Sequence, residues 1–211
     1  MLVKPDDTYW DAVRAMRSSV ADFLQTLTPQ DWDQPSLCPG WRIRDVAGHL
    51  SLVPTITTWE MMAAAPRAGF DPNRVNTILA RRYGSVEQSM IITRIRDHAG
   101  DRRTARVLDA RNSLFDLIVH SQDMALPLGR EFDVPVEYAR SSLDRVWQMG
   151  WPFRAQRRLG HLALSATDIT WTVGTGPQVS GTALTLLLLL TGRSAVAAPR
   201  LHGPGTSALP A

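Results

Sequence analysis

The stretch SLFDLIVHSQDM, residues 113–124, places Asp116, His120 and Asp123 at spacings of four and then three residues. Successive residues of an α-helix turn by about 100°, so side chains three and four apart lie on one face. The polar residues within roughly 60° of Asp116 on such a helix are Asp109, Asn112, Ser113, His120 and Asp123. The predicted helix therefore carries one polar stripe, and the role of that stripe depends on what surrounds it.

The apolar residues of the same helix cover an arc of roughly 220°, about twice the width that a helix lying on a core needs. They are Leu114, Phe115, Leu117, Ile118, Val119 and Met124. Such a helix has protein on most of its sides, so we expect the polar stripe to face a cavity. Carboxylates in a cavity require a cation, hydrogen-bond donors or a metal. The alternative that stays open is an ordinary solvated face.

Apolar residues at intervals of three and four predict that most of the chain is helical. Thr28, followed by Pro29, is expected to cap a short helix, and SVEQ from Ser85 is a capping-box pattern at the start of another. Pro54 is expected to kink a helix that begins near Arg42. The predicted helices span 7–27, 29–32, 42–59, 71–82, 85–98, 104–126 and 135–149.

Beyond residue 150 the pattern changes. LGHLALSA (159–166) and ITWTVG (169–174) alternate and contain β-branched and aromatic residues, which predicts two strands before a leucine-rich helix that ends at Thr191. We therefore expect a helical domain over 1–150 and a small α+β domain over 151–195. The tail 196–211 is rich in small residues, proline and glycine, and is expected to be disordered.

The composition excludes several classes of function. The 211 residues include 23 Lys and Arg against 20 Asp and Glu, and no long block of like charge, so we expect no nucleic-acid partner. Cys38 is the only cysteine, which rules out an intrachain disulfide and suits a reducing compartment. LTLLLLL (184–190) is too short to span a bilayer, and the first ten residues lack the apolar core of a signal peptide. We expect a cytoplasmic protein without a membrane partner.

His49 lies on the apolar face of the helix that begins near Arg42. A lone histidine there is more often a satisfied core residue than a ligand. Together with Asp116 and His120, however, it completes a set of two histidines and one carboxylate, which binds catalytic zinc and leaves one position open. Helical bundles build metal sites in this way, from side chains on facing helices. Non-haem iron uses the same set, so the identity of the metal stays open.

Four other residues receive more ordinary interpretations. Cys38 lies in the Pro/Gly turn LCPGW with no nearby base in the sequence, which favours a structural, partly buried thiol. Trp41 is expected to be a core anchor beside the helix that carries His49. Arg81 and Arg82 are expected to belong to a solvated face rather than to an anion site.

Three segments carry a resemblance to a known family. LTPQDWDQPSLCPGWRIRDVAGHL (27–50), DLIVHSQDMALPLGREFDVP (116–135) and ITWTVGTGPQVSGTALTLLLLLTGR (169–193) resemble the mycothiol-dependent maleylpyruvate isomerase family. This family belongs to the DinB-like metal-binding four-helix bundles. The resemblance implies a mainly α fold, in which a DinB-like four-helix bundle is followed by a small α+β C-terminal appendage. Residues 55–105 show no such likeness.

The resemblance also implies a divalent metal, usually zinc, held by the histidine of the GHL segment and by a carboxylate and a histidine four residues apart. In this sequence the implied ligands are His49, Asp116 and His120. The family's carboxylate is usually glutamate, and aspartate is one methylene shorter. That departure leaves open a change in metal affinity or identity, or a ligand that reaches the metal through water.

Two further residues are candidates around this centre. Asp123, nearly one turn past His120, is a candidate acceptor that orients an imidazole N–H, and the alternative is a surface acid. Arg193 resembles an arginine that the family's C-terminal domain contributes toward substrate carboxylates. The alternative for Arg193 is a cation at the end of the leucine-rich helix.

The family uses mycothiol, a low-molecular-weight thiol, as the cofactor of a cis–trans isomerisation or as the co-substrate of a thiol transfer. The resemblance thus implies a metal-dependent, mycothiol-using transferase or isomerase that acts on a small electrophile. Two alternatives are a metal-binding protein of this fold without turnover, acting in binding or stress response, and a metal-dependent hydrolase with Asp123 as its base. The expected partners are a small thiol and a small electrophile, and self-association as a homodimer is left open.

Overall fold

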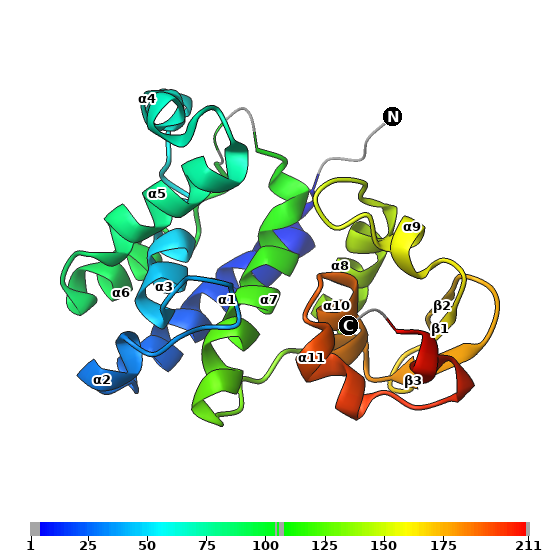
Figure 1. Ribbon diagram of the computed structural model, residues 1–211. Coiled ribbons are helices and arrows are strands. Elements are labelled where there is room, and N and C mark those ends of the chain that lie inside the picture. Colours follow the sequence, from blue (N-terminus) through cyan, green and yellow to red (C-terminus); the bar gives the residue numbers. More distant parts are fainter. Residues whose placement is uncertain (1–4, 104, 106–107, 210–211) are drawn as a thin grey trace. The chain divides into compact units, whose positions relative to one another are not determined.

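The computed structural model describes residues 5–103, 105 and 108–209 (Figure 1). The chain forms two compact units, Met1–Phe132 and Asp133–Ala211. The boundary lies before the helix predicted over 135–149, which therefore belongs to the C-terminal unit and not to the N-terminal one.

Four helices of the N-terminal unit form a bundle. α1 (Asp7–Gln25) packs against α6 (Gln88–Asp97) and α7 (Ser113–Ala125), and α3 (Ile43–Leu52) packs against the same two helices, which closes the ring (Figure 1). The bundle core includes Val13, Met16 and Val20 of α1 and Ile91 and Ile95 of α6. Amphipathic helices of this kind are stabilised mainly by the apolar face that they bury.

The remaining helices of this unit surround the bundle. α5 (Pro72–Gly84) lies along α3, and α2 (Pro29–Trp32), α4 (Thr58–Ala64) and the 3-10 turn η1 (Ala65–Ala68) complete the connections. α3 and α5 approach closely where Gly48 faces Gly84, since a Cβ placed on Gly48 would lie 2.3 Å from the backbone nitrogen of Gly84. Two glycines are therefore what allows these helices to touch.

Three of the differences between the predicted and the observed helix boundaries have a clear local cause. Pro54 does not kink a long helix, because α3 already ends at Leu52 and α4 begins with its own capping box, in which Thr57 accepts from the N–H of Glu60. α6 begins at Gln88, and the capping box predicted at Ser85 is absent. The Ser85 hydroxyl instead donates to the carbonyl of Arg82, at the end of α5.

The third difference concerns the helix that carries the polar stripe. α7 begins at Ser113, after a 3-10 turn η2 (Ala110–Asn112) that is capped by Asp109. The predicted start near residue 104 was too early, and residues 104, 106 and 107 lie outside the described part of the chain. Asp109 forms an ion pair with Arg111 and also accepts a hydrogen bond from the backbone N–H of Arg111. These local contacts stabilise the 3-10 turn, so α7 does not extend further toward the N-terminus.

The C-terminal unit combines helices with a small sheet. α8 (Val136–Gln148) packs against the buried, leucine-rich α10 (Ala183–Leu190), and α9 (Ala155–Leu159) packs on α8. The strands β1 (Ala163–Ala166), β2 (Thr172–Val173) and β3 (Gln178–Gly181) have the order β2-β1-β3. β1 pairs with β2 in antiparallel and with β3 in parallel orientation. The two predicted strands are present, and β3 is a third that the sequence patterns did not indicate.

The tail that was expected to be disordered is structured over its described residues. It forms α11 (Ser194–Ala197) and the turns η4 (Ala198–Arg200) and η5 (Pro204–Ala208), and Leu201 is buried. A backbone bridge joins His202 to Ser180 of β3. Gly203, at φ +111, passes so close to β3 that a Cβ would lie 2.5 Å from the carbonyl oxygen of Gln178. The small residues that suggested disorder instead allow the backbone of this segment to pack closely against β3.

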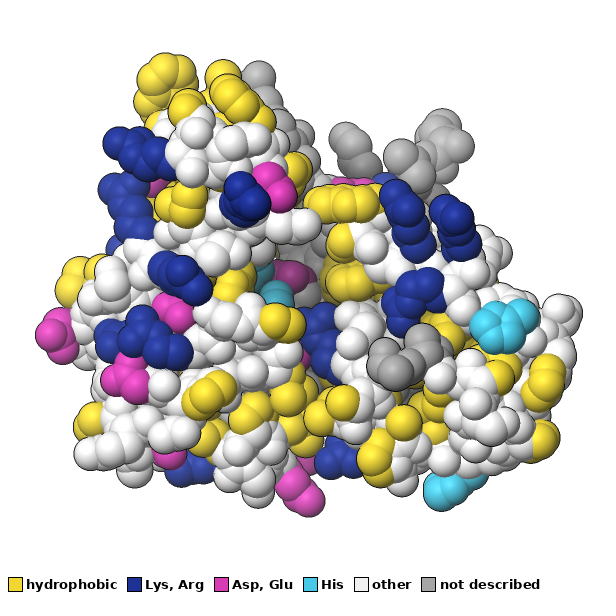
Figure 2. Space-filling view, in the orientation of Figure 1, with side chains coloured by type: hydrophobic (Ala, Val, Ile, Leu, Met, Phe, Trp, Pro, Cys, Tyr) yellow, Lys and Arg dark blue, Asp and Glu magenta, His cyan; other side chains and the backbone are white. Residues whose placement is uncertain are grey.

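Positive and negative side chains lie next to one another on the N-terminal unit (Figure 2). Arg42 and Arg44 both contact Asp33, and Arg96 contacts Asp22. The visible face of this unit therefore has no continuous basic surface, in agreement with the charge pattern of the sequence. None of the helices in the described part of the chain combines the length and the hydrophobicity that crossing a membrane requires.

Candidate metal centre

His49, Asp116 and His120 come together in the N-terminal unit. Nε2 of His49 lies 3.1 Å from Oδ2 of Asp116, and Nε2 of His120 lies 3.5 Å from Oδ1 of the same carboxylate. The imidazole rings meet edge to face, with centroids 4.9 Å apart. The side chain of Asp116 is 26% exposed and that of His120 13%, so the polar stripe is not an ordinary solvated face. The partial exposure of Asp116 leaves the cluster accessible from one side.

The separation of these atoms suits a metal ion. In a tetrahedral zinc site with bonds of about 2.0–2.1 Å to nitrogen and oxygen, neighbouring ligand atoms lie about 3.3 Å apart. The distances of 3.1 and 3.5 Å lie on either side of that value. One ligand atom from each of the three residues fits within 4.8 Å of the other two. The arrangement can therefore hold a divalent cation and leave further coordination positions open.

The two helices are positioned by local contacts. α3 begins at a capping box in which the carboxylate of Asp45 accepts from the N–H of Arg42, and His49 follows one turn later. At the start of α7, the hydroxyl of Tyr9 accepts from the N–H of Leu114 and donates to the carbonyl of Ala110. The ligands thus project from two helices whose N-terminal ends are satisfied by side chains.

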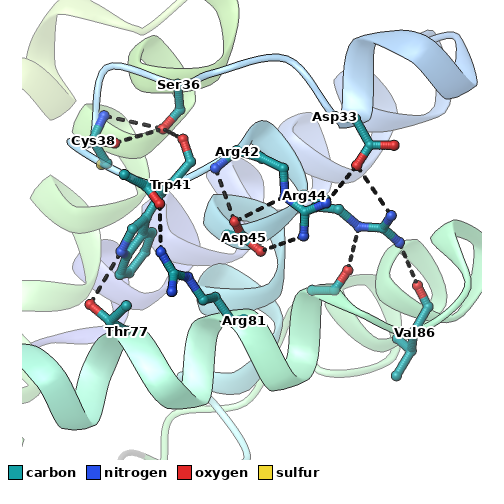
Figure 3. A network of polar contacts seen from close by, with 12 residues as sticks. Asp33, Ser36, Cys38, Trp41, Arg42, Arg44, Asp45, Thr77, Arg81 and Val86 are labelled. Carbon is teal, nitrogen blue, oxygen red and sulfur yellow. Dashed lines mark hydrogen bonds and ion pairs between the residues drawn. The ribbon is translucent and has the colours of Figure 1, made fainter.

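The loop before α3 forms a defined turn, held by Ser36 and Trp41 (Figure 3). The N–H of Trp41 donates to the carbonyl of Cys38 at 3.0 Å, with Pro39 and Gly40 between them. Gly40 has φ +74, the left-handed value that the third position of a type II turn requires. Ser36 closes the loop, since its hydroxyl donates to the carbonyl of Trp41 and accepts from the N–H of Cys38.

Trp41 has the role that the sequence predicted for it. It is buried, its ring is nearly parallel to that of His120 and tilted against that of His49, and its indole N–H donates to Thr77 of α5 at 3.3 Å. It forms an apolar wall of the cluster. Arg81 is exposed and donates to the carbonyl of Gly40, and Arg82 is exposed as well, as expected of a solvated face.

Asp123 lies where an acceptor for an imidazole N–H is needed. Its Oδ2 is 2.9 Å from Nδ1 of His120, and its side chain is completely buried. The same oxygen is 3.0 Å from Sγ of Cys38. The sequence interpretation had Cys38 without a nearby base, and this was wrong, because the fold brings Asp123 and His120 to it from 85 and 82 residues away. Spacing patterns in a sequence indicate contacts between residues a few positions apart, and they do not indicate contacts between residues more than 80 positions apart.

Arg193 belongs to the C-terminal unit. It precedes α11, and Nη1 of its guanidinium donates to the carbonyl of Thr191 at 2.7 Å. This contact is consistent with a cation at the end of α10, and a role toward a substrate carboxylate stays a prediction.

The charge state of His49 depends on Asp116. Burial of His49 alone would lower its pKa, but the charge of Asp116 and the hydrogen bond to its carboxylate raise it, with a smaller contribution from Asn76. The net result is a pKa above the ordinary value. Within the described residues, no hydrogen bond of good geometry reaches Nδ1 of His49. A proton and a metal ion would therefore compete for Nε2 of His49, which lies next to the carboxylate of Asp116.

This balance gives a testable result. In the metal-free protein, Asp116→Asn is expected to move the pKa of His49 from above to below its ordinary value, because burial then acts without an opposing charge. In the native protein the raised pKa stabilises the fold below pH ~6.5, and that stability is lost as the pH rises through the raised pKa. NMR titration of the His49 ring protons measures the shift. A pKa that stays raised in Asp116→Asn would show that another group holds the proton.

The chain matches a family model over residues 13–114, described as the mycothiol maleylpyruvate isomerase N-terminal domain. This match includes His49 and ends two residues before Asp116. No curated protein matches the chain.

Two solved structures have a similar fold. They are the crystal structure of the mycothiol-dependent maleylpyruvate isomerase and that of a histidine-to-alanine mutant of it. In both comparisons the sequence identity is 13%, the TM-score is 0.63, and 97% of each chain is covered. The likeness confirms the expected fold class, a mainly α, DinB-like bundle with a small C-terminal α+β part. Residues 13–114 of this chain therefore carry a domain that matches the mycothiol maleylpyruvate isomerase N-terminal family.

Proposed function

We propose that this chain is an enzyme that holds one divalent metal, in the first instance zinc, on His49, Asp116 and His120, and uses mycothiol to act on a small electrophile. The observation that carries the proposal is the convergence of Nε2 of His49 and Nε2 of His120 on the carboxylate of Asp116, at 3.1 and 3.5 Å. Two imidazoles and one carboxylate suit zinc and leave a position for an exogenous thiol.

When bound, a metal at this site supplies a Lewis acid that lowers the pKa of a thiol and so provides a thiolate at neutral pH. The residues of the chain do the rest. His49, Asp116 and His120 hold the centre, and Asp123 keeps His120 in the tautomer whose Nε2 is free to coordinate. Trp41 limits the space beside both imidazoles. Arg193 is proposed as the cation that binds a substrate carboxylate.

For a cis–trans isomerisation the electron count closes without any other reagent. A thiolate bound at this centre would form a C–S bond to one carbon of an activated double bond, with the π electrons moving onto the activating carbonyl group of the substrate. The substrate could then rotate about the resulting single bond. Return of the electrons would break the C–S bond and restore both the thiolate and a trans double bond. In a thiol transfer the same adduct would be the product, after protonation.

The hydrolase alternative requires a base that can reach a water molecule. Asp123 was the candidate, but its side chain is fully buried and its Oδ2 is held by Nδ1 of His120 and Sγ of Cys38. This geometry favours a positioning role for Asp123, so hydrolysis has no observation in its support. The non-catalytic alternative uses the same metal site and is separated from the proposal by the assay below.

The test combines metal analysis with two assays. Protein purified without added metal is expected to contain about one zinc per chain. The loaded protein should isomerise maleylpyruvate only when mycothiol is present, or consume mycothiol together with a small electrophile. Protein that binds metal but does neither would support the metal-binding protein without turnover. Protein that binds no metal, even after reconstitution, would reject the centre itself.

A further inference from the structure

Cys38 is buried beside the candidate centre, and the proposed chemistry does not use it. Its Sγ lies 3.0 Å from Oδ2 of Asp123 and 3.6 Å from Nδ1 of His120. The thiol is therefore in contact with the side of His120 that faces away from Asp116. The question is what a thiol contributes at that place.

The orientation of His120 depends on its second ring nitrogen. If Nε2 coordinates a metal, Nδ1 carries the proton and must donate it to an acceptor. Oδ2 of Asp123, at 2.9 Å, is that acceptor. Any rotation of the Asp123 carboxylate would lengthen this bond or turn the imidazole, so the position of Oδ2 determines where Nε2 points.

Oδ2 of Asp123 is itself held by Cys38. The Asp123 side chain is completely buried, and a buried carboxylate needs donors to offset the loss of water. The thiol of Cys38 supplies one of them and shares Oδ2 with the N–H of His120. Cysteine is a weak donor, and here it is directed at a carboxylate oxygen, which is a strong acceptor.

The loop that carries Cys38 is fixed to α7 independently of the thiol. The N–H of Leu37 donates to the carbonyl of Asp123 at 3.1 Å, and Ser36 and the turn through Gly40 hold the backbone on either side. The sulfur therefore has little freedom to leave Asp123. A rigid loop with a buried donor is how supporting residues keep a metal ligand in place.

We propose that Cys38 is a positioning residue, whose thiol holds the carboxylate of Asp123 against Nδ1 of His120 and so aims Nε2 of His120 at the metal. This inference rests on the proposed function insofar as the metal centre must form. It adds a residue of the CPGW turn to the machinery of the centre, although that turn contributes no ligand.

A second possible role for Cys38 is that of a direct ligand, since Cys38, His120 and Asp123 also lie close enough to surround an ion. The distances argue against it. On a shared zinc ion, sulfur and oxygen would lie about 3.5 Å apart, given bonds of about 2.3 and 2.0 Å. The observed 3.0 Å between Sγ and Oδ2 and 2.9 Å between Nδ1 and Oδ2 are hydrogen-bond distances. The geometry therefore favours donation.

The test measures metal binding rather than turnover. Zinc affinity is determined by competition with a chelator for the wild type, Cys38→Ala and Cys38→Ser. Cys38→Ala is expected to weaken zinc binding about 10- to 100-fold, the usual effect of losing such a supporting contact. Cys38→Ser keeps a donor and should recover most of that loss. Ser121→Ala is the matched control, because Ser121 is buried next to His120 but donates to the carbonyl of Ile118.

Two further measurements show how Cys38 acts. In the Asp123→Asn background, Cys38→Ala should have little additional effect, because the two residues work through one another. The cobalt(II) form of the wild type should show no thiolate-to-cobalt charge-transfer band, and its ligand-field bands should change in Cys38→Ala. Thermal unfolding of each variant establishes whether it is folded. If Cys38→Ala does not fold, the zinc affinity of Cys38→Ser is compared with that of the wild type instead.

The outcomes separate this inference from the proposed function. If the wild type binds no metal, the centre fails and the inference fails with it. If the wild type binds zinc and folded Cys38→Ala binds it equally well, the centre stands and Cys38 only fills space. A thiolate charge-transfer band would instead make Cys38 a ligand and overturn the positioning role. Equal losses in Cys38→Ser and Cys38→Ala would also contradict donation by the thiol.

Discussion

Asp116→Ala is expected to weaken zinc binding by more than about 100-fold and to abolish thiol-dependent turnover. Partners that only support a ligand typically contribute 10- to 100-fold to metal affinity, so the loss of a ligand should cost more. Asp116 is also the residue to which both imidazoles are directed, at 3.1 and 3.5 Å. Without it, Nε2 of His49 and Nε2 of His120 lose the carboxylate next to them, whereas Nδ1 of His120 keeps its contact with Asp123.

The measurement is zinc affinity by chelator competition, alongside metal content after purification. Asp11→Ala is the control, because it removes an exposed carboxylate from α1 of the same unit. Asp116→Glu introduces the glutamate that the family resemblance implies at this position and should retain metal binding to within about tenfold, since the longer side chain keeps the charge and both oxygens. Unchanged zinc affinity in Asp116→Ala would mean that the metal binds elsewhere.

The parts of the centre that the sequence could indicate are those encoded over short distances. Asp116 and His120 share a helical face because they are four residues apart, and the wide apolar arc of the same helix indicated that this face is enclosed. His49 is 67 residues from Asp116, and it was grouped with the other two because two histidines and a carboxylate form a metal-ligand set and because of the family resemblance, whereas their contact was visible only in the structure. Local patterns thus predict faces of helices, whereas partners across a bundle need the fold.

The features that the sequence could not indicate depend on contacts between distant segments. Arg17 lies among apolar positions of α1 and is almost completely buried, because its guanidinium donates to the carbonyls of His98, Ala99 and Asp101 after the end of α6. Cys38 is similar, since its partner Asp123 is 85 residues away. A polar side chain that is satisfied by distant groups leaves no periodic signal.

Gly48→Ala is expected to destabilise the protein by about 3 kcal/mol or more, the upper range for overpacking a close contact. An added Cβ would lie 2.3 Å from the backbone nitrogen of Gly84 and 2.6 Å from the carbonyl oxygen of Ala80. These are backbone atoms of α5, so α3 and α5 would have to move apart. Because His49 follows Gly48 directly, the same displacement should weaken metal binding in the fraction that folds.

The sign of the effect is decisive, because two principles predict opposite results for this substitution. Helix propensity alone favours alanine over glycine by about 1 kcal/mol inside a helix, so Gly48→Ala would stabilise an isolated α3. Gly100→Ala is the control, since no atom of the described residues lies within 4 Å of its added Cβ, and it should change stability by less than about 0.5 kcal/mol. Urea denaturation of both variants measures the difference. Stabilisation by Gly48→Ala would mean that α3 and α5 do not touch through their glycines, and the position of His49 would then need another explanation.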